Sequence, residues 1–283
     1  MMLSFLLAAA LEFLPADARI SYEAAKTLVD ECTPREAGTI RGRIAANRIL
    51  DMASSKGADA RREMFSVTTP KGERQLTNVY ATYVCGKADD EWVVLVSHYD
   101  TKPDINCPGA NDGASTSGLL VGLANALSRR QEQKGNLLLV WTDGEECMTN
   151  YDGHDGFWGS RQAVEYVARR GYKVRAVICL DMLGDRDLKI GIPANGSPAL
   201  TKIAVLAAQR AGYPGLVSPM AEAVKDDHVP FVEAGHKAID LIDFSYGPDN
   251  SFWHTEKDTL ANISEESLLK SGKIVAELLN ILL

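Results

Sequence analysis

An apolar run that ends abruptly in acidic residues, LLLVWTDGEE (residues 137–146), decides the fold class and poses a chemical question. The continuous apolar stretch 137–141 is typical of a strand that is covered on both faces of a sheet. Shortly after it, Glu145 and Glu146 place two carboxylates side by side, and such a pair is costly to bury because the charges repel each other and lose water. We therefore expect another part of the chain to supply a positively charged partner at the end of this strand.

Working outward from this strand, extended and helical patterns alternate along the chain. The strand candidates, recognised by their apolar runs, are 65–69, 78–84, 91–98, 137–142, 174–180, 188–192 and 237–244. The helix candidates, recognised by their periodicity, are 21–32, 39–55, 114–130, 159–170, 198–211 and a long segment from about 264 onward. This alternation predicts an α/β sandwich around a largely parallel sheet.

The length and the absence of internal divisions predict one domain, residues 20–283, because no linker, repeat or low-complexity tract interrupts the chain. Residues 1–19 are either a signal peptide or an N-terminal helix: they hold a short apolar region, interrupted by Glu12, and the small-residue sequence Ala16-Asp17-Ala18. If they act as a signal, the protein is periplasmic or extracellular, and otherwise it is cytoplasmic. No stretch is long enough to span a membrane, and we expect a monomer.

Charge and cysteine content narrow the function classes further. The 38 acidic and 30 basic residues give a net charge of −8, which argues against nucleic acid or an anionic membrane surface as the main partner. The five cysteines are odd in number, scattered and without a Cys-x-x-Cys pair. A disulfide framework is therefore not expected, although a single bridge stays open.

Polar residues that could bind a metal follow several of the predicted strands. In sheets of this class, ligands gather beyond the carboxyl ends of the strands. A lone aspartate at such a position is usually a turn or helix-capping residue, but five imidazole and carboxylate groups together favour a metal site. Nitrogen and oxygen ligands without a thiolate suit zinc. The candidate ligands are His98, Asp112, Glu146, Asp181 and His254.

These candidates divide into two sets that share one carboxylate. The two oxygens of Asp112 could bridge two ions, with His98 and Asp181 completing one and Glu146 and His254 the other. A bound cation would also answer the opening question, because it offsets the repulsion between the adjacent glutamates. Glu145 then stays free to move a proton. Asp100, two residues after His98, could orient the imidazole as an outer-shell partner.

Taken together, these motifs resemble the superfamily of zinc aminopeptidases and glutaminyl cyclases, from about Thr33 to the C-terminus. The resemblance implies a three-layer sandwich, in which helices flank a central twisted mixed, mostly parallel sheet. It also implies the five ligands named above, with Glu145 as the general base.

Several details are most similar to the glutaminyl-peptide cyclotransferase branch: the segment 65–79, the long spacer after Glu146, the DDHVPF sequence at 226–231 and WHT at 253–255. For that branch the resemblance implies one zinc on Asp112, Glu146 and His254. Asp181 and Asp226 would join the general base in a hydrogen-bond network.

Three interpretations of the function stay open. The first is cyclisation of an N-terminal glutamine to pyroglutamate with loss of ammonia, and the second is hydrolysis of the N-terminal peptide bond with two metal ions. The segment 109–115 favours the second, because it is closer to two-metal aminopeptidases. Both reactions take peptide or protein N-termini as substrates, and pocket aromatic residues such as Tyr151 and Trp253 could decide between them. A non-catalytic binding domain of the same fold is the remote third.

Overall fold

The computed structural model describes residues 10–84, 91–130, 135–151 and 153–283, and within them an eight-stranded mixed sheet has the order β1-β2-β4-β3-β5-β8-β6-β7. The strands are β1 (Asp59–Thr69), β2 (Gly72–Tyr83), β3 (Trp92–His98), β4 (Asn136–Thr142), β5 (Val174–Asp181), β6 (Ile190–Ile192), β7 (Val217–Pro219) and β8 (Ala238–Ile242). The central strands β4, β3, β5 and β8 run parallel, whereas β1, β2 and β6 join the sheet by antiparallel pairing. The predicted mixed, mostly parallel sheet is confirmed.

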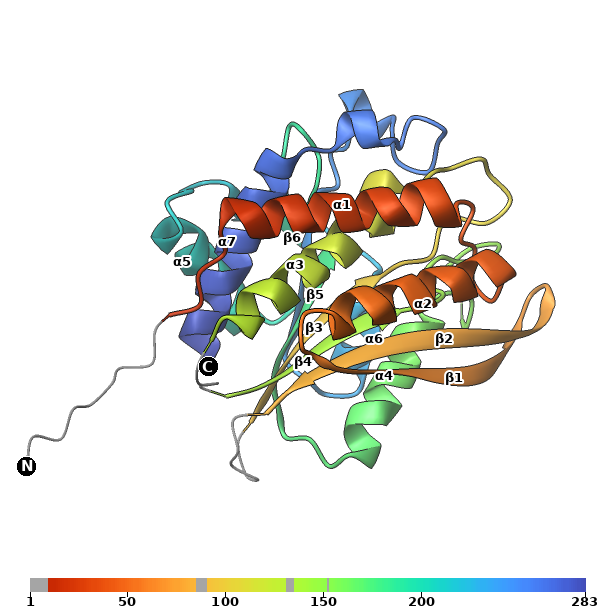
Figure 1. The fold of residues 1–283 in the computed structure, drawn as a ribbon, viewed down its shortest axis with the longest axis horizontal. Coiled ribbons are helices and arrows are strands. Elements are labelled where there is room, and N and C mark those ends of the chain that lie inside the picture. The colour runs from red at the N-terminus through yellow and green to blue at the C-terminus, as the bar shows by residue number, and fades with distance from the viewer. Residues whose placement is uncertain (1–9, 85–90, 131–134, 152) are drawn as a thin grey trace, which may run out of the picture.

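Helices cover both faces of this sheet (Figure 1). The α-helices are α1 (Pro15–Cys32), α2 (Ile40–Ser54), α3 (Thr116–Ser128), α4 (Trp158–Arg169), α5 (Pro198–Arg210), α6 (His228–Glu233) and α7 (Glu265–Leu282). Shorter helical turns are η1 (Ala110–Ser115), η2 (Pro248–Asn250) and η3 (Leu260–Asn262). The larger hydrophobic core contains residues of α1, α2, α3, α5 and α7, and the smaller one contains residues of α4 and α6.

The opening stretch behaves as its composition predicts. In β4, Leu137 and Leu139 enter the larger core, whereas Leu138 and Val140 enter the smaller core on the opposite face. Every residue of β4 is buried, and the same is true of β3. The continuous apolar run is therefore explained by a strand with helices on both sides.

Some element boundaries differ from the sequence prediction. The segments 65–69 and 78–84 belong to a longer hairpin, β1 and β2, whose strands pair from Asp59 with Thr82 to Thr69 with Gly72. The strand-like segment 188–192 is reduced to the three residues of β6, and β7 was not predicted. β6 pairs with β8 on one side and with β7 on the other, and β7 is the edge strand. Each has only three residues, which is too short for a clear strand pattern in the sequence.

The N-terminal segment is part of the packed fold from residue 10 onward, while residues 1–9 lie outside the described residues. Leu11 and Phe13 are in the larger core, and the first turn of α1 contains the candidate cleavage sequence. Within that turn, Asp17 is fully buried and makes an ion pair with Arg129 at 2.6 Å. These contacts favour an N-terminal helix for residues 15–19, and the location of the protein stays a prediction.

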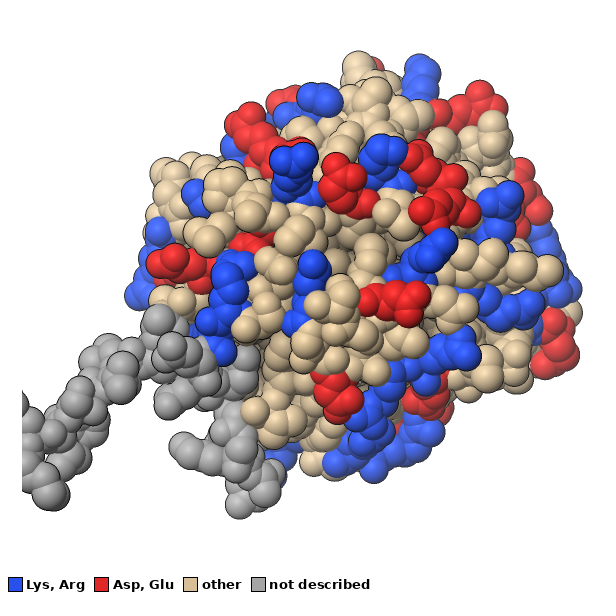
Figure 2. Space-filling model, viewed as in Figure 1, with Lys and Arg blue, Asp and Glu red and all other residues tan. Residues whose placement is uncertain are grey.

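The structure also bears on the predictions about disulfides and membrane spans. The four described cysteines, Cys32, Cys107, Cys147 and Cys179, are free thiols, and Cys85 lies outside the described residues. No helix among the described residues is long and apolar enough to cross a membrane. On the face shown in Figure 2, acidic and basic side chains are interspersed over the helices.

Candidate metal centre

The parallel strands β4, β3 and β5 are neighbours, so their carboxyl ends lie side by side at one end of the sheet. His98 is the last residue of β3 and Asp181 the last of β5. Glu145 and Glu146 follow β4 after a tight turn at Gly144, whose φ of +80° favours glycine. Sheet topology thus brings together residues that are far apart along the chain.

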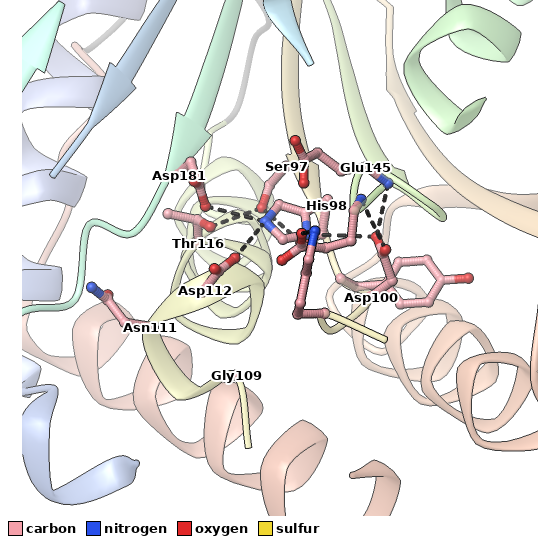
Figure 3. A network of polar contacts seen from close by, with 12 residues as sticks. Ser97, His98, Asp100, Gly109, Asn111, Asp112, Thr116, Glu145 and Asp181 are labelled. Carbon is pink, nitrogen blue, oxygen red and sulfur yellow. Dashed lines mark hydrogen bonds and ion pairs between the residues drawn. The ribbon is translucent and has the colours of Figure 1, made fainter. Parts of the chain in front are cut away.

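All five predicted ligands converge at the carboxyl ends of these strands, in two groups that share Asp112. In the first group, Nε2 of His98 lies 3.1 Å from Oδ1 of Asp112 and 3.2 Å from Oδ1 of Asp181. Figure 3 shows both carboxylates on the same side of the His98 ring. In the second group, Nε2 of His254 lies 3.3 Å from Oδ2 of Asp112 and 2.9 Å from Oε1 of Glu146. Each oxygen of Asp112 therefore faces a different histidine, as the bridging hypothesis requires.

Asp112 reaches this position because η1 is irregular. The backbone of Asp112 is non-helical (φ −89°, ψ 94°), so the predicted helix begins regular α geometry only at Thr116. At Gly113, an added Cβ would lie 2.6 Å from the carbonyl oxygen of His98. Only glycine allows the turn to come this close to the end of β3.

Asp258 holds the same turn from the other side, and it was missed in the sequence. Its buried carboxylate accepts hydrogen bonds from the backbone N–H groups of Asn111 (2.7 Å) and Asp112 (3.1 Å) and from the hydroxyl of Tyr246 (2.8 Å). Burial, followed by the charge of Asp112, raises the pKa of Asp258 to about 7. The sequence signal that could have identified Asp258 is its place four residues after His254, in a loop that supplies a ligand.

Asp100 has a broader role than the one predicted. One of its oxygens lies 3.5 Å from Nδ1 of His98, which is consistent with an outer-shell partner for the imidazole. In addition, its carboxylate accepts the backbone N–H groups of Glu145 (3.1 Å) and Glu146 (3.2 Å). Asp100 therefore links the end of β3 to the turn that carries both glutamates.

Two of the site residues lie on or next to unusual backbone. His254 has a φ of +54°, and Met182, directly after Asp181, has a φ of +55°. A left-handed conformation at residues other than glycine is uncommon and costs on the order of 1–3 kcal/mol. The surrounding contacts must maintain these conformations, which is typical of residues positioned for function.

The cluster attracts positive charge. Burial alone would lower the pKa of His254, but Glu146 and Asp112 raise it to about 9. The pKa of His98 is likewise raised well above its ordinary value by three surrounding aspartates, against the effect of burial. Burial raises the pKa of Asp181 to about 6 and that of Glu145 well above its ordinary value, the latter with a further contribution from Glu146. A bound cation would relieve this excess of buried carboxylates.

A cavity of about 260 Å³ opens onto the cluster. Its polar lining includes Asp112, Glu145, Glu146, Tyr151, Asp181, Lys225, Asp226 and His254, and its apolar lining includes Ala223, Val224, Ile242, Phe244 and Trp253. Both predicted pocket aromatic residues, Tyr151 and Trp253, therefore line the cavity. Trp158, a neighbouring aromatic residue in the sequence, packs against Ala37 and Leu76 in a separate hydrophobic cluster.

Asp226 lines the cavity too, but its hydrogen bonds differ from the implied network. Its Oδ1 accepts the thiol of Cys179 at 3.3 Å and the backbone N–H of Asp227. Among the described residues, no hydrogen bond joins Asp226 to Glu145 or Asp181. The three carboxyl groups line the same cavity, but the hydrogen bonds found among the described residues do not join them.

The donor set fits zinc. Both groups offer imidazole nitrogen and carboxylate oxygen, with no thiolate, and their ligand atoms lie within 4.8 Å of one another. Tetrahedral zinc with bonds of about 2.0–2.2 Å separates its ligands by about 3.3–3.6 Å. The contacts of 2.9–3.3 Å between these side chains are only slightly shorter, so a small outward shift would accommodate an ion.

Comparison with known proteins agrees with this geometry. The sequence profile of peptidase family M28 matches residues 78–279, which include all five candidate ligands. The chain belongs to peptidase family M28. The resemblance inferred from the motifs is thereby confirmed.

Individual relatives fall into both branches of the superfamily. A glutaminyl cyclase from an Acidobacteriales bacterium is 30% identical, with a TM-score of 0.89 and coverage of 100% of this chain and 99% of that chain. The glutaminyl-peptide cyclotransferase-like protein of Bos taurus is 26% identical and matches 86% of this chain and 70% of its own length. Aminopeptidase YwaD of Bacillus subtilis (strain 168) is 27% identical over 65% of this chain and 39% of that protein.

Proposed function

We propose that this M28 family member is a zinc-dependent glutaminyl-peptide cyclotransferase, which converts an N-terminal glutamine into pyroglutamate and releases ammonia. The observation that carries the proposal is the position of Glu145, a buried carboxylate that lines the same cavity as the Asp112, Glu146 and His254 group. The full-length match to a glutaminyl cyclase supports the proposal from a separate direction.

The cavity suits a free peptide N-terminus. Glu145, Asp181 and Asp226 supply carboxylates that attract an α-ammonium group, while Ile242 and Trp253 supply apolar wall for the methylene groups of a glutamine side chain. A volume of about 260 Å³ limits how much of a peptide can enter. The first residue would occupy the cavity, and the rest of the peptide would leave through its opening.

The reaction needs one group that can both take and return a proton. The α-amine, in its neutral form, would attack the side-chain amide carbon with its lone pair, and Glu145 would accept the proton that this nitrogen then loses. The new C–N bond closes the five-membered ring as the bond to the amide nitrogen breaks. Glu145 then returns the proton to the leaving nitrogen, so one ammonia departs and no water is consumed.

Asp112, Glu146 and His254 are the residues that would hold the ion. When bound there, zinc supplies a Lewis acid that polarises the amide carbonyl. Asp100 fixes the backbone of Glu145 and Glu146, so the base and the ligand keep a constant separation through the reaction. A substrate that fills the cavity would exclude bulk water from Glu145, which favours internal attack by the amine over hydrolysis.

One observation favours aminopeptidase activity as a second candidate. The His98, Asp112 and Asp181 group is as complete as the other one, so the chain retains ligands for two ions. With both positions filled, Glu145 would take a proton from a water molecule that attacks the first peptide carbonyl. The match to an aminopeptidase over part of the chain is consistent with this candidate.

Mass spectrometry separates the two reactions directly. Zinc-loaded protein is incubated with a Gln-initiated peptide and a Leu-initiated peptide of otherwise identical sequence, and Glu145→Gln protein serves as the matched control. Loss of one ammonia from the first peptide alone supports the cyclotransferase. Release of the first residue from either peptide supports the aminopeptidase, and two unchanged peptides would contradict both.

A further inference from the structure

The two carboxylate oxygens of Glu146 face different surroundings. Its Oε1 lies 2.9 Å from Nε2 of His254, on the side where the candidate ligands converge. Its Oε2 accepts a hydrogen bond from the hydroxyl of Tyr151 at 2.9 Å and lies 3.3 Å from Nζ of Lys102. One oxygen is therefore directed toward the ion position, and the other is bound by two donors.

The hydroxyl of Tyr151 also contacts the general base. It lies 3.2 Å from Oε2 of Glu145 as well as 2.9 Å from Oε2 of Glu146, so it sits between the two adjacent carboxylates. The tyrosine ring is held in place by stacking on Phe157, with centroids 4.9 Å apart. Its backbone carbonyl accepts a hydrogen bond from Lys225 at 2.7 Å. These contacts fix the hydroxyl between the two adjacent carboxylates.

Lys102 is equally constrained. Its Nζ donates to the carbonyl oxygen of Cys147 at 3.1 Å and lies 2.9 Å from the sulfur of the same residue. It also lies 5.0 Å from the centre of the Tyr151 ring, within the range of a cation–π contact. The lysine side chain is only 18% exposed. Among the ion pairs of the described residues, Lys102 is the one lysine or arginine that reaches a candidate zinc ligand.

We propose that Lys102 and Tyr151 form a positioning pair, which holds Glu146 with a single oxygen directed at the metal. The same pair keeps Glu145 away from the metal, so that Glu145 acts as the base. The ammonium of Lys102 and the hydroxyl of Tyr151 both contact Oε2 of Glu146, the oxygen directed away from the ion position. Held in this way, Oε2 cannot turn toward the ion to make a second bond. The pair thus assigns different roles to two glutamates that are adjacent in sequence. This inference rests on the proposed zinc site, but not on which of the two reactions follows.

The test measures zinc affinity separately from turnover. Tyr151→Phe removes only the hydroxyl, Lys102→Met removes the ammonium with its charge and its N–H donors, and Lys102→Arg keeps a charged donor. The zinc dissociation constant of each variant is determined by competition with a chromophoric chelator. The kcat and KM for a Gln-initiated peptide are measured at saturating zinc.

Matched controls come from equivalent residues outside the cavity lining. Tyr172→Phe removes a hydroxyl from a ring that stacks on Trp92. Lys257→Met removes a charge whose Nζ lies 5.9 Å from the centre of the Phe252 ring. Thermal unfolding of every variant shows whether the fold is retained.

We expect Tyr151→Phe and Lys102→Met to weaken zinc binding roughly 10–100-fold, as loss of an outer-shell partner does in other zinc sites. At saturating zinc, kcat should fall more than KM rises, because the base is displaced while the substrate pocket remains. Lys102→Arg should restore zinc affinity to within a few-fold of wild type, and both controls should match wild type. The double variant should lose less than the product of the two single losses, since both donors act on one oxygen.

Wild-type zinc affinity in both Tyr151→Phe and Lys102→Met would overturn the proposal. Zinc binding by Lys102→Arg as weak as that of Lys102→Met would overturn the role of the charge. Failure of the wild-type protein to cyclise any Gln-initiated peptide would contradict the proposed function instead, and the zinc measurements would still decide the role of the pair.

Discussion

Nε2 of His254 lies 2.9 Å from Oε1 of Glu146, although 108 residues separate them along the chain. Neither residue belongs to a strand: Glu146 follows β4, and His254 lies in the loop between β8 and α7. Their contact exists only when the sheet has formed and the loop is folded onto it. Metal binding and folding should therefore be coupled, because the unfolded chain offers no such site.

The first prediction follows from this contact. His254→Ala removes the nitrogen ligand of the Asp112 and Glu146 group, so the purified variant should contain substantially less zinc than the wild type. Metal analysis after dialysis against a weak chelator checks this. His154→Ala, at an exposed position in a loop, is the matched control and should retain full zinc content. Equal zinc in His254→Ala and wild type would reject His254 as a ligand.

The second prediction separates the base from the ligands. Glu145→Gln keeps the size of the side chain but cannot accept a proton, so kcat should fall by about 10²–10⁴-fold or more. Zinc content should stay at the wild-type level, because Glu145 belongs to neither candidate ligand group. Steady-state kinetics and metal analysis on the same preparation check both halves. Near-normal turnover would remove Glu145 as the base.

The third prediction concerns removal of the metal. Asp112, Glu146 and Asp181 are almost fully buried and come together only in the folded chain, so a cation bound among them stabilises the fold. Chelation should lower the Tm, and added zinc should restore it. With free zinc at a thousand times the Kd, binding stabilises the fold by about 4 kcal/mol. Magnesium at the same concentration is the control, and a Tm that does not respond to zinc would argue against the site.

Zinc stoichiometry distinguishes the two candidate reactions. For the cyclotransferase we expect one zinc per chain, bound at the His254 group, so His98→Ala should leave the zinc count at one. For a two-metal aminopeptidase, the count should fall from two to one in the same variant. Native mass spectrometry reads the number of bound ions directly. Two ions in the wild type, with no ammonia release from a Gln-initiated peptide, would reverse the preference between the candidates.

Much of the fold and the ligand groups follows from local sequence signals. The alternation of Leu137 to Trp141 between two cores follows from an apolar run of strand length. Four of the five ligands follow from polar residues placed after predicted strands, because parallel strands must bring their carboxyl ends together. The fifth, Asp112, follows from its place at the start of a predicted helix. Asp100 was predicted as a partner of His98, but the backbone contacts that support the ligands were not predictable in this way. Asp258 and Asp100 act through backbone N–H groups, which leave no pattern in the sequence.

The N-terminal helix shows a second limit of prediction from the sequence. Its apolar stretch and small residues suit a signal peptide, but burial of Asp17 depends on Arg129, which is distant in sequence. Only the folded chain shows that Asp17 accepts two hydrogen bonds from that arginine, at 2.6 and 2.7 Å, and one from the backbone N–H of Leu14 at 2.7 Å. The amino-acid composition of the N-terminal segment does not reveal these contacts between distant residues.

The last prediction uses this ion pair. Burial alone would raise the pKa of Asp17, but the hydrogen bonds from Arg129 and from the backbone of Leu14 outweigh it and lower the pKa below its ordinary value. A carboxyl with a lower pKa in the folded state stabilises the fold above its unfolded pKa of about 3.9, and this contribution disappears as the pH falls through the folded value. Asp17→Asn should therefore lower the free energy of unfolding by about 1–3 kcal/mol at pH 7, and the difference from wild type should shrink below about pH 4.

Urea unfolding of zinc-free protein at pH 7 and pH 3 measures this difference without a contribution from metal release. Asp30→Asn, which removes an exposed carboxylate from the same helix, is the control and should change the unfolding free energy little at either pH. A loss for Asp17→Asn that is equal at both pH values would mean that side-chain packing, and not the charge, matters at this position. A loss confined to neutral pH would show that the first turn of α1 is bound to α3 by its charge. Cleavage after Ala18 would then remove a stabilising part of the fold.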